Sequence, residues 1–340
     1  MMKTVWFWVG CVAIWVNFAV GSVAAAADKT PVLTVYASDS FTSDWGPGPQ
    51  LEKSFEARCH CDLRWVGLSG GASILQRLRL EGEASPADVV LSLDMNLMQA
   101  AEKTGLLTPY QFELPELNLP VEWTSSVFVP YDWSYFSFVY DARQLSQPPT
   151  SLKALVDAPD DLKVIIEDPR TSTPGFGLLL WVKAVYGDQA PQAWARLSRK
   201  ILTVTPGWSE AYQSLFLKGE APLVMSYSTS PAYHLTVEHS DRYRAAQFDE
   251  GHYLQVEVGA VAQHSAHPQL AQNFLQFLIS EQAQKSLPLT NYMYPVIDIG
   301  SALPPAFHDL IQPQSLLISP DRVAANRRDW IHEWLEAYTR

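Results

Sequence analysis

Residues 168–177, with the sequence Asp-Pro-Arg-Thr-Ser-Thr-Pro-Gly-Phe-Gly, have the composition of an anion-binding turn. A short apolar strand is expected at 163–167, and a helix is expected at 178–186. Thr173 precedes Pro174, and a hydroxyl at the N-cap followed by a proline is typical of a helix start. The first turn of a helix has unpaired N–H groups, and its dipole attracts negative charge. The stretch therefore predicts either an anion cradle or a capped helix start without a ligand.

Five aromatic residues lie in polar loops or at the polar end of a strand: Trp45, Trp208, Tyr227, Tyr233 and Tyr292. Aromatic faces in a cleft can hold a cationic or flat heteroaromatic ligand. Together with an anion cradle, they suggest a ligand that has a positive ring and an anionic end. The alternative is that each ring only anchors its loop to the core.

Patterns for catalysis are missing from the sequence. There is no G-x-S-x-G, no H-E-x-x-H and no Walker loop. Cys59, His60 and Cys61 follow one another, and in an oxidising compartment we favour a tight local disulfide. A metal site is the alternative, although nothing nearby completes a zinc-binding set. We expect a binding protein and not an enzyme.

Strand and helix patterns alternate along the chain, which predicts an α/β fold. Small, hydroxyl or acidic residues follow three early strands, at Ser38, Ser69 and Asp94. Ligands of α/β sheets collect at such carboxyl ends. The strands are expected at 31–36, 62–68, 87–93 and 223–227, and the helices at 50–58, 74–80, 97–104, 191–200, 271–278 and 319–338, with a turn at 69–73 and a loop at 287–295.

Two long β-rich stretches, about 127–140 and 252–261, are interpreted as hinge strands that cross between two lobes. The first lobe would be discontinuous and comprise 28–135 and 255–340. The second lobe would comprise 136–254.

The N-terminus has the features of a secretory signal peptide, which we assign to residues 1–27. Lys3 supplies a positive start, an apolar run follows, and Ala24 to Ala27 form a small-residue cleavage site. Cys11 lies deep in the apolar run, a poor context for lipid attachment. A retained membrane anchor is the alternative, and the alanine run argues against it.

The chain is acidic, with a formal net charge of −12 over 340 residues. No basic run is present, which argues against nucleic acid as a partner. An acidic surface is compatible with a cationic ligand.

Six stretches, spread nearly end to end, resemble the periplasmic thiamine-binding proteins of bacterial ABC importers. They are Val32-Leu-Thr-Val-Tyr36, Asp44-Trp-Gly-Pro-Gly-Pro49, Asp168-Pro-Arg-Thr-Ser-Thr-Pro-Gly175, Gly207-Trp-Ser-Glu-Ala-Tyr212, Ser226-Tyr-Ser-Thr-Ser-Pro-Ala-Tyr-His234 and Glu250-Gly-His-Tyr-Leu-Gln-Val-Glu-Val258. Cys59 and Cys61 also resemble the closely spaced cysteines of that family.

The resemblance implies a two-lobed, type II periplasmic-binding fold with mixed sheets flanked by helices and the ligand in the cleft. It implies a periplasmic monomer that has no cofactor. This monomer would bind thiamine, thiamine monophosphate and thiamine diphosphate and would deliver them to a membrane permease with a cytoplasmic ATPase.

The resemblance also implies residue roles. Ser172 and Thr173 would contact phosphate, and Ser69 and Gly70 would contribute from the first lobe. The remaining ligand-binding positions would be Trp45, Trp208, Tyr227, Ser228, Thr229, Ser230, Tyr233 and Tyr292.

The sequence departs from the family pattern at several of these positions. The family has acidic residues where this chain has Ser69 and Gly70, a tryptophan in place of Tyr292, and an aromatic near Ser38. The loss of an acid would weaken a partner for the aminopyrimidine or the positive ring, so affinity and the preferred thiamine form stay open.

Two alternatives follow from the same residues. A ferric-ion carrier of this fold would use Tyr227 and Tyr233 as phenolate ligands. An exported enzyme that modifies thiamine would need a nucleophile, and the sequence offers no clear candidate.

Overall fold

The computed structural model describes residues 1–6 and 30–339. Pro31–Arg340 forms one compact unit, separate from Met1–Thr30. Most of the expected signal peptide, residues 7–27, lies outside the described residues. Among the residues that are described, no helix combines the length and the apolar character needed to cross a membrane.

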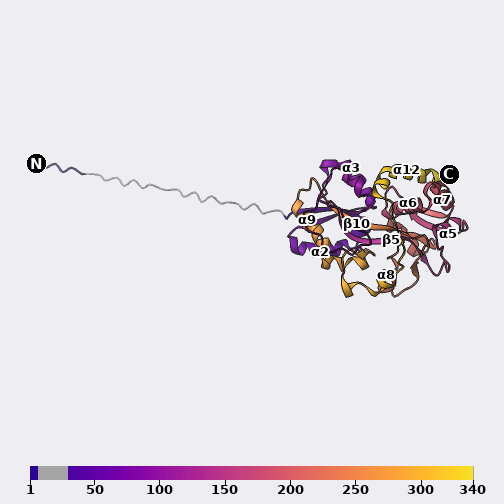
Figure 1. The fold of residues 1–340 in the computed structure, drawn as a ribbon. Helices are drawn as coiled ribbons and strands as arrows, with labels where there is room; N and C mark the ends of the chain where they lie inside the picture. The colour runs from indigo at the N-terminus through magenta and orange to yellow at the C-terminus, as the bar shows by residue number, and fades with distance from the viewer. Residues whose placement is uncertain (7–29, 340) are drawn as a thin grey trace. The chain divides into compact units, whose positions relative to one another are not determined.

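The described residues form a mixed twelve-stranded sheet (Figure 1). Its main path runs β2-β1-β3-β10-β5-β8-β6-β7, and four two- or three-residue strands pair alongside it. β1 is parallel to β2 and β3, and β6 is parallel to β7 and β8, whereas β10 and β5 are antiparallel to their neighbours on the path. The strands are β1 (Val32–Ser38), β2 (Asp62–Leu68), β3 (Val89–Asp94), β4 (Leu107–Thr108), β5 (Val129–Asp141), β6 (Val164–Glu167), β7 (Ile201–Thr205), β8 (Leu223–Tyr227), β9 (Tyr243–Ala245), β10 (His252–Ala262), β11 (Tyr294–Pro295) and β12 (Ser315–Leu316).

The strand β5 joins the two halves of this sheet. Its first part, from Val129 to Tyr135, pairs with β10, and its second part, from Phe136 to Tyr140, pairs with β8. The β-rich stretch at 127–140 is therefore a single continuous strand that serves both halves. β10 is buried at every residue, so the polar residues that alternate along it do not face solvent.

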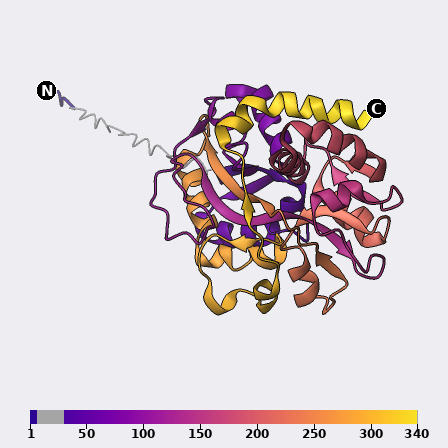
Figure 2. The same ribbon diagram turned by 45° about the vertical axis from the view of Figure 1, so that its right-hand side comes forward.

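Helices flank the sheet on both sides (Figures 1 and 2). α9 shows why these residues form a helix, because Phe274, Leu275 and Leu278 recur at helical spacing and are buried. The helices are α1 (Asp39–Thr42), α2 (Gly48–Cys59), α3 (Gly71–Glu81), α4 (Met98–Glu102), α5 (Leu152–Asp157), α6 (Thr173–Tyr186), α7 (Ala190–Leu197), α8 (Pro231–Thr236), α9 (Pro268–Leu278), α10 (Glu281–Gln284), α11 (Leu287–Thr290) and α12 (Pro320–Thr339).

The C-terminal helix α12 packs mainly on α7 and also contacts α4 and α6 (Figure 2). Trp334 meets Trp194 edge-on at 6.4 Å between ring centroids. Lys183 Nζ lies 3.1 Å from Glu333 Oε1. Near its other end, Asp321 accepts a hydrogen bond from Gln99 of α4.

Three sequence expectations are wrong in detail. The turn expected at 69–73 is shorter, because α3 begins at Gly71. The apolar spacing of Ile74, Leu75, Leu78 and Leu80 predicts one buried face, yet the Leu80 side chain is exposed, because the other three define the inner face. The stretch 287–295 is not simply a loop, since it contains α11 and β11.

The structure joins Cys59 and Cys61 by a disulfide, with the two Cα atoms 5.2 Å apart. Among the described residues, no group of three or more histidine, cysteine, aspartate or glutamate side chains is arranged to hold a metal ion. The Cys59–Cys61 disulfide is the pairing expected for an oxidising compartment, in preference to a metal site.

Candidate functional site

Trp208 is the centre of an aromatic cluster that lines a small cavity. Its ring centroid lies 4.8 Å from that of Tyr212, 5.7 Å from Tyr292 and 5.9 Å from Trp45. Four of the predicted site residues therefore share one cavity, because Tyr227 lines it as well. The complete lining is Ser40, Trp45, Trp208, Tyr227, Glu257, Thr290, Asn291, Tyr292 and Met293.

Each aromatic residue is held by the end of a secondary-structure element. Trp208 follows β7, and its Nε1 donates to Ser226 Oγ at 2.8 Å. Tyr227 is the last residue of β8. Tyr292 follows α11 with a φ of 58°, in the left-handed region that non-glycine residues seldom adopt. The rings are thus fixed by the scaffold and by local backbone geometry.

A carboxylate, Glu257, forms part of the cavity wall. It lies in β10, where it pairs with Asp132 of β5 on one side and with Asp94 of β3 on the other. All three side chains are buried. Tyr131 donates its hydroxyl to Glu257 Oε2 at 2.7 Å, and Asn291 Nδ2 donates to Asp132 Oδ2 at 2.6 Å. The cavity therefore combines aromatic faces with one buried carboxylate in its wall, and two further buried acids lie beside that carboxylate in the sheet.

Burial changes the titration of this acidic wall. It raises the pKa of Glu257 to about 7 and that of Asp94 to about 6, since the charged forms lose their hydration. The pKa of Asp132 lies well above its ordinary value because of burial and the nearby charge of Glu257. Burial also raises the pKa of Tyr227 well above 10, which disfavours a phenolate at this position.

The anion loop, residues 168–177, contains the start of α6, which begins at Thr173 and not at the expected position 178; the N-cap lies one position before the expected Thr173. Ser172 is the N-cap, and its Oγ accepts a hydrogen bond from Gly175 N at 3.4 Å. Thr173 is the first helical residue and not the cap. Ser172 takes this role because its backbone is extended, with φ −102° and ψ 141°.

The anion loop meets the start of α3 face to face. Gly71 N donates to Thr173 Oγ1 at 3.2 Å, and Ser73 Oγ donates to the Thr171 carbonyl at 3.3 Å. A Cβ atom added to Gly70 would lie 3.0 Å from the Thr171 carbonyl oxygen and 3.1 Å from Ser172 Cα. The predicted phosphate-side residues of both halves are thus brought together, with little space between them.

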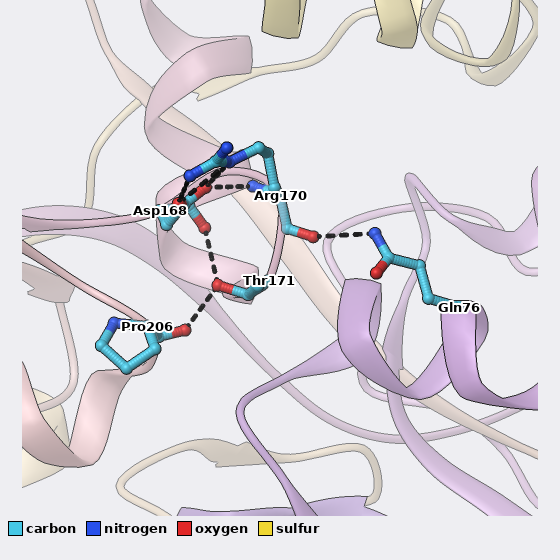
Figure 3. A network of polar contacts seen from close by, with 5 residues as sticks. All are labelled: Gln76, Asp168, Arg170, Thr171 and Pro206. Atoms are coloured by element: carbon cyan, nitrogen blue, oxygen red, sulfur yellow. Dashed lines mark hydrogen bonds and ion pairs between the residues drawn. The ribbon is translucent and has the colours of Figure 1, made fainter. Parts of the chain in front are cut away.

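Side-chain bonds reinforce this contact (Figure 3). Gln76 Nε2 donates to the Arg170 carbonyl at 3.3 Å, and Thr171 Oγ1 donates to the Pro206 carbonyl at 2.7 Å. Arg170 is paired with Asp168, at 2.9 Å from Nε to Oδ1. The only cationic side chain of the loop is therefore neutralised by its neighbour.

The two regions adjoin at Gly207, the residue before Trp208. A Cβ atom at Gly207 would lie 2.8 Å from the Ser69 carbonyl oxygen. A further contact is made by Ser209, the residue before the π-helix Glu210–Leu215. Its Oγ donates to Asp39 Oδ1 of α1 at 2.9 Å. Anion loop and cavity thus form one continuous candidate site.

Ser228, Thr229 and Ser230 do not line the cavity. Ser228 Oγ and Thr229 Oγ1 lie 3.3 Å and 2.8 Å from Ser134 Oγ, and Ser230 Oγ lies 2.9 Å from Ser226 Oγ. Their hydroxyls therefore already have partners within the protein. Tyr233 does not line the cavity either, but its ring centroid lies 4.7 Å from that of Tyr292.

The cavity is almost closed. Its volume is about 30 Å³, which is room for water and far below the several hundred Å³ of a small-molecule site. A heteroaromatic ligand therefore does not fit the cavity in this conformation.

Sequence reasoning missed the polar part of this cavity. Glu257 and Asn291 were not among the predicted residues, nor were Ser40, Thr290 and Met293, which also line the cavity. No local signal marks Glu257, because polar and apolar residues alternate over 252–258 and a carboxylate in such a pattern resembles a solvent-facing residue.

The chain belongs to the bacterial extracellular solute-binding proteins, whose family model matches residues 23–287. It is 55% identical over 311 residues to the "Thiamine-binding periplasmic protein" of Escherichia coli (strain K12), covering 91% of this chain and 94% of that protein. The solved "Periplasmic thiamin binding protein" is 54% identical, with a TM-score of 0.88, covering 92% of this chain and 97% of the other.

A structure with an iron-related name also resembles this chain. The solved "Ferric binding protein from Campylobacter jejuni" has a TM-score of 0.72 at 18% identity and covers 90% of this chain and 99% of its own. At that identity the likeness is one of fold. Both solved proteins therefore confirm the expected α/β solute-binding fold, and the ferric-binding protein is the more distant relative.

Proposed function

We propose that this protein is the periplasmic binding component of an ABC importer and carries thiamine, thiamine monophosphate and thiamine diphosphate. The observation that supports this best is the cavity in which Trp45, Trp208, Tyr227 and Tyr292 surround an acidic wall at Glu257. Thiamine has a permanent positive charge on a flat ring, and aromatic faces and a carboxylate both attract such a charge. The names of the relatives at 54–55% identity agree with this ligand.

In this proposal the positive ring of thiamine lies against Trp208 and faces Glu257. The phosphate of the longer ligands lies at the start of α6, where Ser172 and Thr173 offer hydroxyls and the first turn offers N–H groups. Ser69 and Gly70 cover this end. Ser228, Thr229, Ser230 and Tyr233 support Tyr227 and Tyr292 from behind.

Ligand entry would involve two lobes, 28–135 with 255–340 and 136–254. The bonds from Gly71 to Thr173 and from Ser209 to Asp39 would then join one lobe to the other. β5 passes from one half of the sheet to the other and is suited to act as a hinge strand, with β10 as the second. Opening would break these bonds and enlarge the cavity.

The remaining parts of the proposal concern partners. The loaded protein would act as a monomer and would deliver its ligand to a permease with a cytoplasmic ATPase. It would have no cofactor and no catalytic role, because thiamine would leave the site chemically unchanged.

Isothermal titration calorimetry with thiamine and thiamine monophosphate tests the function directly. We expect saturable binding of both ligands, with quenching of tryptophan fluorescence at Trp208. Absence of heat and of quenching at about millimolar ligand, the weak end of specific binding, would contradict the proposal.

A ferric-ion titration tests the alternative in the same preparation. We expect no visible tyrosinate band, because burial holds the pKa of Tyr227 above its ordinary value. A strong band with Fe(III), in a protein that does not bind thiamine, would favour the ferric carrier.

A further inference from the structure

Three carboxylates form a row across three neighbouring strands. Glu257 of β10 lies directly opposite Asp132 of β5 and directly opposite Asp94 of β3. Directly opposed residues of antiparallel strands project from the same face, and like charges in these positions repel. The exposed fractions of the three side chains are 6%, 0% and 1%. Such a row is costly unless protons or a cation compensate its charge.

The hydrogen bonds that reach the row come from neutral donors. Tyr131 donates to Glu257 Oε2 at 2.7 Å, and Gln255 Nε2 donates to Glu257 Oε1 at 3.1 Å. Asn291 Nδ2 connects two of the acids, at 2.6 Å from Asp132 Oδ2 and 3.4 Å from Glu257 Oε2. Neutral donors lower the cost of one negative charge but do not neutralise two neighbouring ones.

One atom of the row has no partner. Asp132 is fully buried, and its Oδ1 makes no hydrogen bond within the part of the chain that the structure describes. Asp94 is better satisfied, because its Oδ1 accepts from Asn96 N at 2.7 Å and Arg327 of α12 favours its charged form. The uncompensated charge is therefore concentrated on Glu257 and Asp132, and Glu257 faces the aromatic cavity.

We propose that Glu257 and Asp132 share one proton in the empty site and that a cationic ligand in the cavity displaces this proton to solvent. The inference rests on the proposed function and adds a mechanism of charge recognition to it. The only bond that breaks is the carboxyl O–H, and its proton passes to the buffer. The positive ring of the ligand then takes the place of the proton as counter-charge. The proton exchange thus selects for a permanent cation, whereas stacking on the aromatic rings would hold a neutral ring as well.

This exchange has a definite pH dependence. The titratable groups that face Glu257 are Asp94, Asp132, Tyr131 and Tyr227, and all of them are held towards their neutral forms by burial. Because the pKa of Glu257 is about 7, the free protein carries the shared proton below neutral pH and loses it above. Affinity for a cation should therefore rise with pH across this range, and proton release should decrease.

Calorimetry in two buffers with different ionisation enthalpies counts the protons released. The ligands are thiamine and its neutral thiophene analogue, which keeps the aminopyrimidine and lacks the positive charge. For thiamine we expect release of about one proton at about pH 6, falling towards zero at about pH 9. For the analogue we expect no release in excess of that from the aminopyrimidine ring.

Two variants locate the proton. In Glu257→Gln the proton release on thiamine binding should be lost, and the preference for thiamine over its neutral analogue should fall by about tenfold or more, about one pKa unit of interaction. Asp132→Asn should reduce proton release in the same way. Glu116→Gln removes an exposed carboxylate elsewhere and should preserve both quantities.

The outcomes separate the two proposals. If thiamine binds with an enthalpy that is independent of the buffer, or releases no more protons than the analogue, this inference is overturned and the proposed function stands. If neither ligand binds to the unmodified protein, both are overturned. The comparison of buffers uses the unmodified protein, so it decides the matter even if a variant does not fold.

Discussion

At the anion loop, Ser172 and Thr173 are neighbours in sequence and sit at the start of one helix. At the aromatic cavity, Trp45, Trp208, Glu257 and other residues come from segments scattered along the chain. The first region depends on local helix chemistry, and the second depends on the pairing of β3, β10 and β5.

The two regions also differ in charge. The hydroxyls of the anion loop are neutral, and its cation Arg170 is paired with Asp168. The cavity wall holds the buried acid Glu257, which lies opposite the buried Asp132 of the neighbouring strand. In the proposed function the acidic region would determine whether a thiamine-like cation binds, whereas the neutral region would accept ligands with or without phosphate. The following predictions test this division, in order of expected effect.

Replacement of Trp208 should have the largest effect on binding. Trp208→Ala removes the ring around which the cavity is built and should weaken thiamine binding by about 1 to 3 kcal/mol. Calorimetry gives the affinity, and circular dichroism shows whether the protein is folded. Trp123→Phe, which alters a tryptophan outside the cavity, is the matched control. Unchanged affinity in a folded Trp208→Ala protein would remove this residue from the site.

The acidic wall should make the stability of the free protein depend on pH. The pKa of Glu257 is about 7 in the folded protein, compared with 4.5 for an ordinary glutamate. Between these values the folded state holds more protons than the unfolded state, so stability falls as pH rises. We expect a loss of about 2 kcal/mol between about pH 5 and 8, at about 1.4 kcal/mol per pKa unit.

Urea unfolding of the unmodified protein and of Glu257→Gln at several pH values measures this loss as the difference between their free energies of unfolding. The contribution of His252 is the same in both proteins and cancels in this difference. Burial lowers the pKa of His252 to about 4, so its contribution has the opposite sign: the stability is lost as pH falls. Parallel pH profiles for the two proteins would contradict the prediction.

Removal of the Ser172 hydroxyl should affect mainly the phosphorylated ligand. Ser172→Ala should cost about 1 kcal/mol of stability through loss of the helix cap and should weaken thiamine monophosphate relative to thiamine by about fivefold. Ser151 caps α5 in the same manner, accepting from Ala154 N at 2.9 Å. Ser151→Ala should therefore match the loss of stability and leave the ratio of the two affinities unchanged. Equal weakening of both ligands by Ser172→Ala would place the phosphate of thiamine monophosphate elsewhere.

Enlargement of the ring at Tyr292 should have the smallest effect. Tyr292→Trp offers a wider stacking face and should strengthen thiamine binding by less than about 1 kcal/mol. The left-handed backbone is equally unfavourable for both residues, so strain should not change. Tyr294→Trp, at a ring stacked on Trp133 outside the cavity, is the control. A decrease in affinity would show that the space beside Tyr292 is already filled when ligand is bound.

The sequence predicted much of the local structure. The limits expected for β2 and β8, 62–68 and 223–227, agree with the structure. Such runs are short, rich in apolar residues and bounded by turn residues, so local pattern is sufficient. The position of the N-cap was one residue wrong, because two neighbouring hydroxyls compete and backbone conformation decides between Ser172 and Thr173.

The acidic part of the site could not be predicted from local pattern. Asp94, Asp132 and Glu257 become neighbours only through the register of three strands that are distant in sequence. Without that register, each acid resembles a residue at a strand end or on a solvent-facing position. The aromatic residues were easier to identify, because a large ring in a polar loop stands out by its type alone.

The packing of α12 has a consequence for attempts to divide the protein. Although α12 ends the chain, Trp334 covers Trp194, and Lys183 of α6 is bonded to Glu333. A recombinant fragment that contains only 136–254 would leave these tryptophan and lysine side chains without their cover. We therefore expect such a fragment to aggregate, and we expect its solubility to be restored when α12 is supplied as a separate peptide or fused through a flexible linker. The twenty residues of α12 would then be required to cover a segment that precedes them in synthesis.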